Sequence, residues 1–211
     1  MYTRFILFFL IVISGTLFGQ KDPVAKSVLD KFSEKALTAQ SVMLDFSLTV
    51  TDEVNSTTSE SQGVLIVKGD MYKLDLPENI IWFNGTTIYT YAPEVEEVTV
   101  TEPDPDDEKF LSSPGLLFTL YRDGYKYRLI GESPDGYLID LYPEEPVTEF
   151  SRIRLHITRN HLLAEAEYKR KDGITMVITI NNSDLTKKYP ESFFNFDPGN
   201  YSEVEIIDMR F

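Results

Sequence analysis

Apolar residues recur at helical spacing near the start of the chain, between residues 22 and 39. Val28, Leu29 and Phe32 fall on one face of a helix with 3.6 residues per turn, and charged residues fall on the opposite face. Asp22-Pro23 stands just before them, which is typical of an N-cap followed by a first-turn proline. The pattern predicts one amphipathic helix over 22–39, and its apolar face needs an apolar surface to cover.

From residue 42 onward, apolar and polar residues alternate in short runs, which is typical of strands with one buried face. The runs predicted to be strands are 42–50, 64–67, 72–76, 80–83, 86–91, 95–101, 125–130, 137–142, 152–158, 162–169, 174–180 and 204–207. Asn84-Gly85, Gly69-Asp70 and Asp172-Gly173 predict tight turns between neighbouring strands. The polar stretch 51–61 is expected to be a loop.

One insertion interrupts the strands. An acidic, proline-rich segment at 102–109 leads into an apolar stretch at 110–121, which is expected to form a short helical insertion. Around a dozen short strands joined by tight turns predict a mainly β fold, in which a large antiparallel sheet curls on itself. About eight strands suffice for a packed barrel interior, so a sheet of about eleven leaves room for an apolar ligand; a filled core is the alternative.

The first twenty residues have the layout of a signal peptide. A positive start at Arg4 precedes the apolar run 5–13, and small and polar residues follow as far as Gln20. The apolar run is about half the length that a membrane-spanning helix needs. We therefore expect cleavage near Gln20 and export of one soluble domain, 21–211.

Charge and cysteine content narrow the candidate partners. The sequence has 20 Lys and Arg against 34 Asp and Glu, a net charge of −14. A field of this sign repels nucleic acid and anionic lipid headgroups and favours basic protein surfaces. The sequence contains no cysteine. Disulfides are therefore excluded, and the expected cleavage site lacks the cysteine that anchors a bacterial lipoprotein.

Catalytic and metal-binding patterns are not found in the sequence. His156 and His161 lie at positions expected to be on the surface, and no cluster of His, Cys and carboxylates surrounds them. The acidic run at 104–108 lacks the glycine and the ligand spacing of a calcium loop, and no phosphate-binding glycine loop is present. The sequence predicts a protein that is not an enzyme and needs no metal or cofactor.

Several segments, taken in order, match one known family. They are Met-Leu-Asp-Phe at 43–46, the stretch 63–74, the block from Asn84-Gly85 to Thr99, and Phe-Asn-Phe-Asp-Pro-Gly at 194–199 with Asp-Met-Arg at 208–210. In these segments the chain resembles the outer-membrane lipoprotein carrier proteins, the periplasmic chaperones of the Lol system in double-membrane bacteria.

The resemblance implies an incomplete (half-open) antiparallel β-barrel of about eleven strands, covered by a lid made of the N-terminal helix and the insertion at 110–121. The lid helix would use Val28, Leu29 and Phe32. The family's apolar cavity takes acyl chains, and the residues that we expect to face it are Leu44, Phe46, Tyr72, Leu74, Tyr89, Tyr91, Leu116, Leu117 and Leu120. Such a carrier would be a monomer, receive acylated lipoproteins from an ATP-driven inner-membrane complex, and pass them to an outer-membrane acceptor.

Two departures from the family pattern concern the lid and the aromatic block. Many members have Lys-Arg-Pro where this chain has Lys68-Gly69-Asp70, so the arginine associated with lid closure is missing, and Lys68 or Lys73 is a candidate replacement. Tyr89 stands where tryptophan is common. Three other functions remain open: the lipid-anchored acceptor of the same pathway, a regulator that senses lipoproteins, and a binder of a small apolar molecule.

Overall fold

The computed structural model describes residues 21–103, 114–145, 148–201 and 203–210. The expected signal peptide and most of the acidic segment, with the first residues of the insertion, lie outside these residues. The strands are β1 (Val42–Asp52), β2 (Thr57–Lys68), β3 (Met71–Asp75), β4 (Ile80–Phe83), β5 (Ile88–Ala92), β6 (Glu97–Thr101), β7 (Tyr125–Glu132), β8 (Gly136–Pro143), β9 (Phe150–Thr158), β10 (Leu163–Arg170), β11 (Ile174–Asp184) and β12 (Glu205–Asp208). The helical elements are α1 (Pro23–Thr38) and the short 3-10 helices η1 (Pro114–Phe118), η2 (Leu120–Arg122), η3 (Glu191–Phe194) and η4 (Pro198–Asn200).

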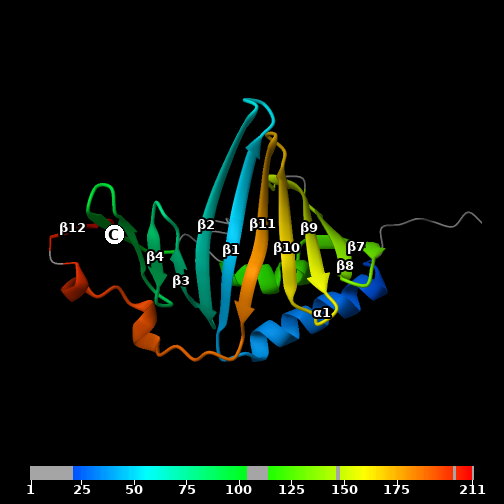
Figure 1. The fold of residues 1–211 in the computed structure, drawn as a ribbon, viewed down its shortest axis with the longest axis horizontal. Helices are drawn as coiled ribbons and strands as arrows, with labels where there is room; N and C mark the ends of the chain where they lie inside the picture. The colour runs from blue at the N-terminus through cyan, green and yellow to red at the C-terminus, as the bar shows by residue number, and fades with distance from the viewer. Residues whose placement is uncertain (1–20, 104–113, 146–147, 202, 211) are drawn as a thin grey trace, which may run out of the picture.

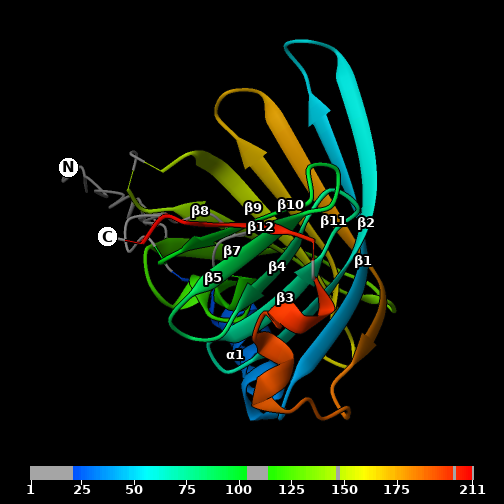
Figure 2. The same ribbon diagram turned by 90° about the vertical axis from the view of Figure 1, so that its left-hand side faces the viewer.

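All twelve strands belong to one sheet, in the order β12-β6-β5-β4-β3-β2-β1-β11-β10-β9-β8-β7. Neighbouring strands are antiparallel except β12, which runs parallel to β6. The end strands β12 and β7 do not pair with each other, so the sheet bends without closing into a barrel (Figures 1 and 2). The predicted mainly β, half-open architecture is confirmed, with twelve strands rather than about eleven.

The hairpin of β1 and β2 corrects the prediction of a loop at 51–61. The two strands pair without interruption from Val42 opposite Val67 to Asp52 opposite Thr57, and only 53–56 form the turn. Asp52 closes that turn, because its Oδ1 accepts hydrogen bonds from two backbone N–H groups of the turn, 2.9 Å away in each case. The first half of β2 is polar and exposed because β3 pairs only with Val64 to Lys68, and in Figure 1 this end of β1 and β2 rises above β3 and β4.

The sheet has an inner, concave face and an outer face, and both are covered in part. α1, η1 and η2 pack on the inner face and form one core with the apolar side chains of the strands. On the outer face, the segment after β11 runs past β3 to β6 before it enters β12 (Figure 1). Its side chains Phe196 and Tyr201 form a second cluster with Trp82, Val98 and Val100.

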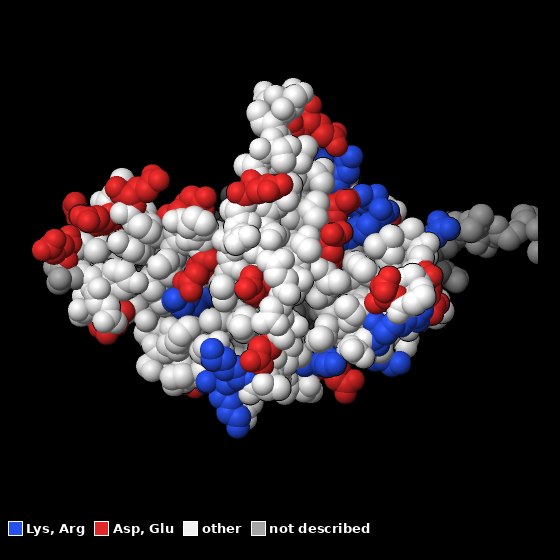
Figure 3. Space-filling view, in the orientation of Figure 1, with Lys and Arg blue, Asp and Glu red and all other residues white. Residues whose placement is uncertain are grey.

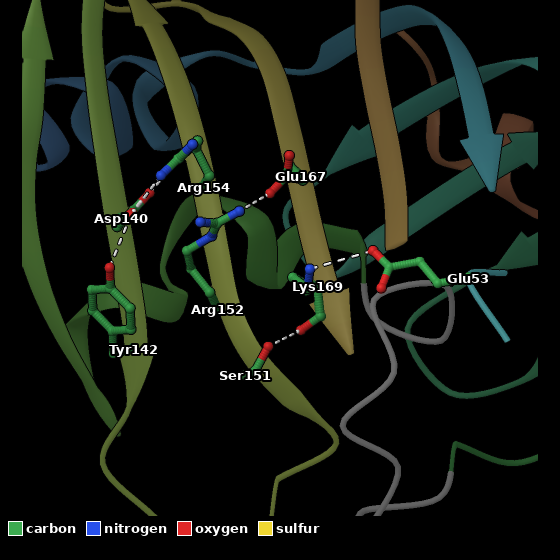
Figure 4. A network of polar contacts seen from close by, with 8 residues as sticks. All are labelled: Glu53, Asp140, Tyr142, Ser151, Arg152, Arg154, Glu167 and Lys169. Carbon is green, nitrogen blue, oxygen red and sulfur yellow. Dashed lines mark hydrogen bonds and ion pairs between the residues drawn. The ribbon is translucent and has the colours of Figure 1, made fainter. Parts of the chain in front are cut away.

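Polar contacts tie the outer face of β8, β9 and β10 together (Figure 4). Arg154 binds both carboxylate oxygens of Asp140, at 2.6 and 2.9 Å, and the Tyr142 hydroxyl donates to the same carboxylate at 2.9 Å. Arg152 pairs with Glu167 on the neighbouring strand. These contacts fix the register of the three strands whose opposite face lines the interior of the molecule.

Candidate functional site: an apolar cavity beneath the lid

The lid begins where α1 is fixed to strand β7. Asp22 caps the helix, since its Oδ1 accepts hydrogen bonds from the backbone N–H groups of Val24 and Ala25 at 2.9 and 3.2 Å. Its other carboxylate oxygen accepts from the N–H of Leu129 at 3.1 Å. One side chain therefore sets both the start of α1 and its position on the sheet edge. These hydrogen bonds lower the pKa of Asp22 although partial burial opposes them.

The inner face of α1 is apolar, and it is continuous with the core. Val28, Leu29 and Phe32, the residues expected on the apolar face of the lid helix, are all buried. The ring of Phe32 lies 5.7 Å from that of Phe118 in η1. The apolar face of α1 thus packs both on the sheet and on the insertion.

Two polar contacts also join α1 to the insertion. The Tyr121 hydroxyl donates to Asp30 at 2.8 Å, and Arg122 Nη2 donates to Ser33 Oγ at 2.8 Å. Ser33 has no exposed surface, so its hydroxyl is satisfied by protein groups. The insertion is 3-10 rather than α-helical within the described residues, and it forms the second half of the lid.

A narrow apolar cavity of about 120 Å³ lies between the lid and the inner face of the sheet. The ring of Phe46 lines it and lies over Gly63, directly opposite on β2, where any side chain would collide with that ring. The cavity is lined by Leu44, Phe46, Leu48, Leu65, Leu74, Leu76, Pro114, Leu117, Glu149, Phe150, Tyr168, Arg170, Met176, Ile178 and Ile180. Aliphatic and aromatic side chains dominate this wall, so it suits hydrocarbon rather than a polar ligand.

A second, wider and more open cavity of about 670 Å³ adjoins the first. The two share Leu117, Phe150 and Tyr168, which makes them neighbouring parts of one interior. The second cavity also has polar groups in its wall, among them Arg122 and Glu145. A molecule that occupied both would place its most apolar part in the narrow cavity and could expose polar parts in the wide one.

The structure brings most of the predicted cavity residues together. Leu44, Phe46, Leu74 and Leu117 line the narrow cavity, and Leu116, Leu117 and Leu120 line the wide one. Tyr72 belongs to the same inner core but does not line either cavity; its ring lies 5.5 Å from that of Phe83.

Tyr89 and Tyr91 were predicted to face the cavity, and this prediction is wrong. Tyr89 is directly opposite Trp82, and both side chains point to the outer face, where Tyr89 stacks on Phe196 with ring centroids 5.7 Å apart. Tyr91 packs against Tyr201 in the same outer cluster, at 4.8 Å. Alternation along β5 shows that its residues have two environments, but it does not show which of them is the interior.

Within the described residues, Lys68 and Lys73, the two candidates to replace the family's lid arginine, make their hydrogen bonds and ion pairs outside the lid. Lys68 Nζ donates to the backbone carbonyl of Tyr189 at 3.1 Å, and Lys73 pairs with Asp75 at 2.7 Å. The ammonium of Lys73 also lies over the rings of Trp82 and Phe193. Both lysines therefore hold the C-terminal segment and the outer face, and Tyr121 and Arg122 supply the polar contacts of the lid instead.

Charges are distributed unevenly around the sheet. The sequence contains no Lys or Arg between Lys73 and Lys109, and Figure 3 shows acidic side chains over the end of the sheet formed by β5, β6 and β12. Basic side chains lie mainly over the other half of the molecule (Figure 3). No group of three or more His, Asp or Glu residues within the described ranges is placed to hold a metal ion. Among those residues, no helix is long and apolar enough to cross a membrane.

A family model described as "Outer membrane lipoprotein carrier protein LolA" matches residues 37–197. The chain belongs to this family. The outer-membrane lipoprotein carrier protein of Vibrio campbellii is 24% identical to it over 97% of this chain and 96% of that protein. The family match includes the strands around the narrow cavity and both 3-10 helices of the lid.

Two solved structures are similar to this chain at low sequence identity. An uncharacterized conserved protein from Thermus thermophilus superposes with a TM-score of 0.56 and 11% identity, over 88% of this chain and 99% of that chain. A LolA superfamily protein from Nitrosomonas europaea has a TM-score of 0.45 and 14% identity, over 82% of this chain and 98% of that chain.

Proposed function

We propose that this protein is a periplasmic carrier that encloses the acyl chains of lipoproteins and moves them from the inner to the outer membrane. It is exported by a cleaved segment at residues 1–20, takes its cargo from an ATP-driven inner-membrane complex, and delivers it to an outer-membrane acceptor. The protein performs no catalysis in this role. The observation that carries the proposal is the apolar cavity beneath a lid, found in a member of the lipoprotein carrier family.

The physical need for such a carrier is large. A lipoprotein with two or three long chains has roughly 40 methylene groups, and exposing each to water costs about 0.8 kcal/mol. Unassisted transfer through water would therefore cost a free energy on the order of 30 kcal/mol. A protein that offers an apolar wall, and a lid that can separate from it, lowers this cost while still allowing release.

The structure also offers a way to enlarge the narrow cavity. The narrow cavity, with a volume of about 120 Å³, cannot hold several acyl chains, so chains that enter it from the wide cavity must displace the lid. α1 is not part of the sheet, and η1 and η2 join it through one ring contact and two hydrogen bonds. Outward movement of α1 with the insertion would expose the inner face of the sheet without breaking any strand pairing.

Release of lipoproteins from inner-membrane vesicles tests this proposal. Met176 is half-buried and lines the narrow cavity, so Met176→Glu places a charge in the path of the acyl chains without filling a fully buried site. We expect the variant to release at least about tenfold less lipoprotein into the soluble fraction, because a carboxylate in an apolar site costs several kcal/mol.

Thr175→Glu is the matched control. Thr175 is the neighbouring residue, is also half-buried, and lies on the outer face opposite Lys169 on β10. The new carboxylate would be beside a cation, and release should stay close to that of the unmodified protein. Normal release by Met176→Glu, with the variant folded by circular dichroism, would refute the proposed function.

A further inference from the structure

One arginine interrupts the apolar wall of the narrow cavity. Tyr168 and Arg170 on β10 both line this cavity, so both side chains lie on the inner face of the sheet. Among the residues that line this cavity, Arg170 and Glu149 are the charged ones. Arg170 and Glu149 therefore form the charged part of a wall that otherwise consists almost entirely of hydrocarbon, and the Arg170 guanidinium, at the end of β10, is partly exposed to solvent.

Two carboxylates hold Arg170 in different ways. Asp172 binds one edge of the guanidinium, with Nε 3.1 Å from both carboxylate oxygens and Nη2 2.6 Å from Oδ2. Glu149 lies 3.0 Å from Nη1 at the other edge, and about half of its side chain is exposed. Asp172 therefore orients the guanidinium, and Glu149 occupies the edge that a ligand could take over.

We propose that Arg170 binds the carboxylate of a fatty acid whose hydrocarbon chain lies in the narrow cavity. Glu149 shows that a carboxylate fits at Nη1, and a fatty acid would replace it while Asp172 stays in place. A guanidinium binds carboxylates through charge-assisted hydrogen bonds in a fixed geometry, whereas a neutral ester offers it only a weaker acceptor. This ligand goes beyond the lipoprotein cargo of the proposed function, but it uses the same cavity.

Binding of a fluorescent long-chain fatty acid, cis-parinaric acid, and of its methyl ester provides the test. The unmodified protein should bind the acid more tightly than the ester. Arg170→Met keeps a long apolar side chain but removes the donors, so affinity for the acid should fall about tenfold while affinity for the ester stays the same. Glu149→Gln removes the competing carboxylate and should strengthen binding of the acid.

Arg210→Met is the matched control, because Arg210 also pairs with an aspartate two residues away but lies at the end of β12, far along the sheet from β10. Affinity for both probes should be unchanged in this variant. The inference is overturned if Arg170→Met leaves binding of the acid unchanged, or if it weakens the acid and the ester equally.

The two proposals fail in distinguishable ways. If the unmodified protein binds neither probe, the cavity does not accept acyl chains, and the proposed function fails together with this inference. If the ester binds, and Arg170→Met leaves the affinity for the acid unchanged, the cavity retains its proposed role and only the fatty-acid site is refuted.

Discussion

Asp140 lies on the outer face of the sheet and is almost completely buried, with only 2% of its surface exposed. Burial alone raises its pKa, but the hydrogen bonds from Arg154 and Tyr142 outweigh burial, so the pKa lies below the ordinary value of 3.8. A carboxyl group whose pKa is lower in the folded state stabilises the protein above its unfolded pKa. That contribution is lost as the pH falls through the folded pKa.

We therefore expect Asp140→Asn to destabilise the protein at neutral pH by about 2–4 kcal/mol, because Arg154 would lose its partner in a partly buried site. The difference in unfolding free energy between variant and unmodified protein should shrink as the pH falls below the ordinary carboxyl pKa of 3.8 and through the lower pKa of folded Asp140, where this group itself becomes protonated. Urea denaturation at pH 7 and at pH 3 measures both values. A difference that is the same at both pH values would contradict this account of Asp140.

Tyr89 and Tyr91 show that the sequence predicts a strand but does not predict which of its faces lines the cavity. Their alternation with Thr90 identifies a strand with two different faces. Both faces of this part of the sheet are covered, however, and the outer cover comes from Phe196 and Tyr201, about a hundred residues further along the chain. Leu44, Phe46 and Leu74 line the narrow cavity because they lie where the lid covers the inner face.

At the scale of elements, α1 and η2 are joined by two hydrogen bonds that involve side chains of both. Removing them by Ser33→Ala and Tyr121→Phe should cost about 1 kcal/mol each in unfolding free energy. Amide hydrogen exchange in α1 should become faster, while exchange in the central strands should change little, because no strand pairing is altered.

Lys26→Ala provides the comparison for these variants. Lys26 pairs with Asp30 inside α1 at 2.6 Å and is exposed, so its loss should hardly change stability. If exchange in α1 is as slow in the Ser33→Ala, Tyr121→Phe double variant as in Lys26→Ala, these hydrogen bonds do not hold the lid.

Periodicity predicted α1 and the strand pattern because each has one buried face and a repeat that matches its geometry. It missed the first half of β2 in its hairpin with β1, because a strand segment that is exposed on both faces has no apolar alternation. Paired backbone groups and threonines hold this hairpin instead, with Thr51 and Thr58 opposite each other. The length of such a hairpin depends on backbone hydrogen bonding between its strands, and the pattern of apolar residues carries no information about that.

At the scale of the whole molecule, the bent sheet is covered on its two faces by segments with different roles. The lid covers the inner face and borders the cavity, whereas the C-terminal segment covers the outer face and leads into β12. The proposed function requires the lid to move, whereas it requires no movement of the C-terminal segment. The two covers should therefore differ in their effect on ligand binding even where they contribute similarly to stability.

Phe32 in α1 and Phe194 in η3 allow this comparison, since both are buried phenylalanines in covering segments, with exposures of 3% and 0%. Phe32→Ala and Phe194→Ala should each lower the unfolding free energy by about 3 kcal/mol, because each leaves a cavity. Phe32→Ala should also speed the association of an acyl-chain probe, since it removes the contact with Phe118 and loosens the lid. Phe194→Ala should leave that rate unchanged. Stopped-flow fluorescence, under conditions where both variants are folded, measures these association rates. If both variants bind the probe equally faster, both covering segments, and not the lid alone, control access to the cavity.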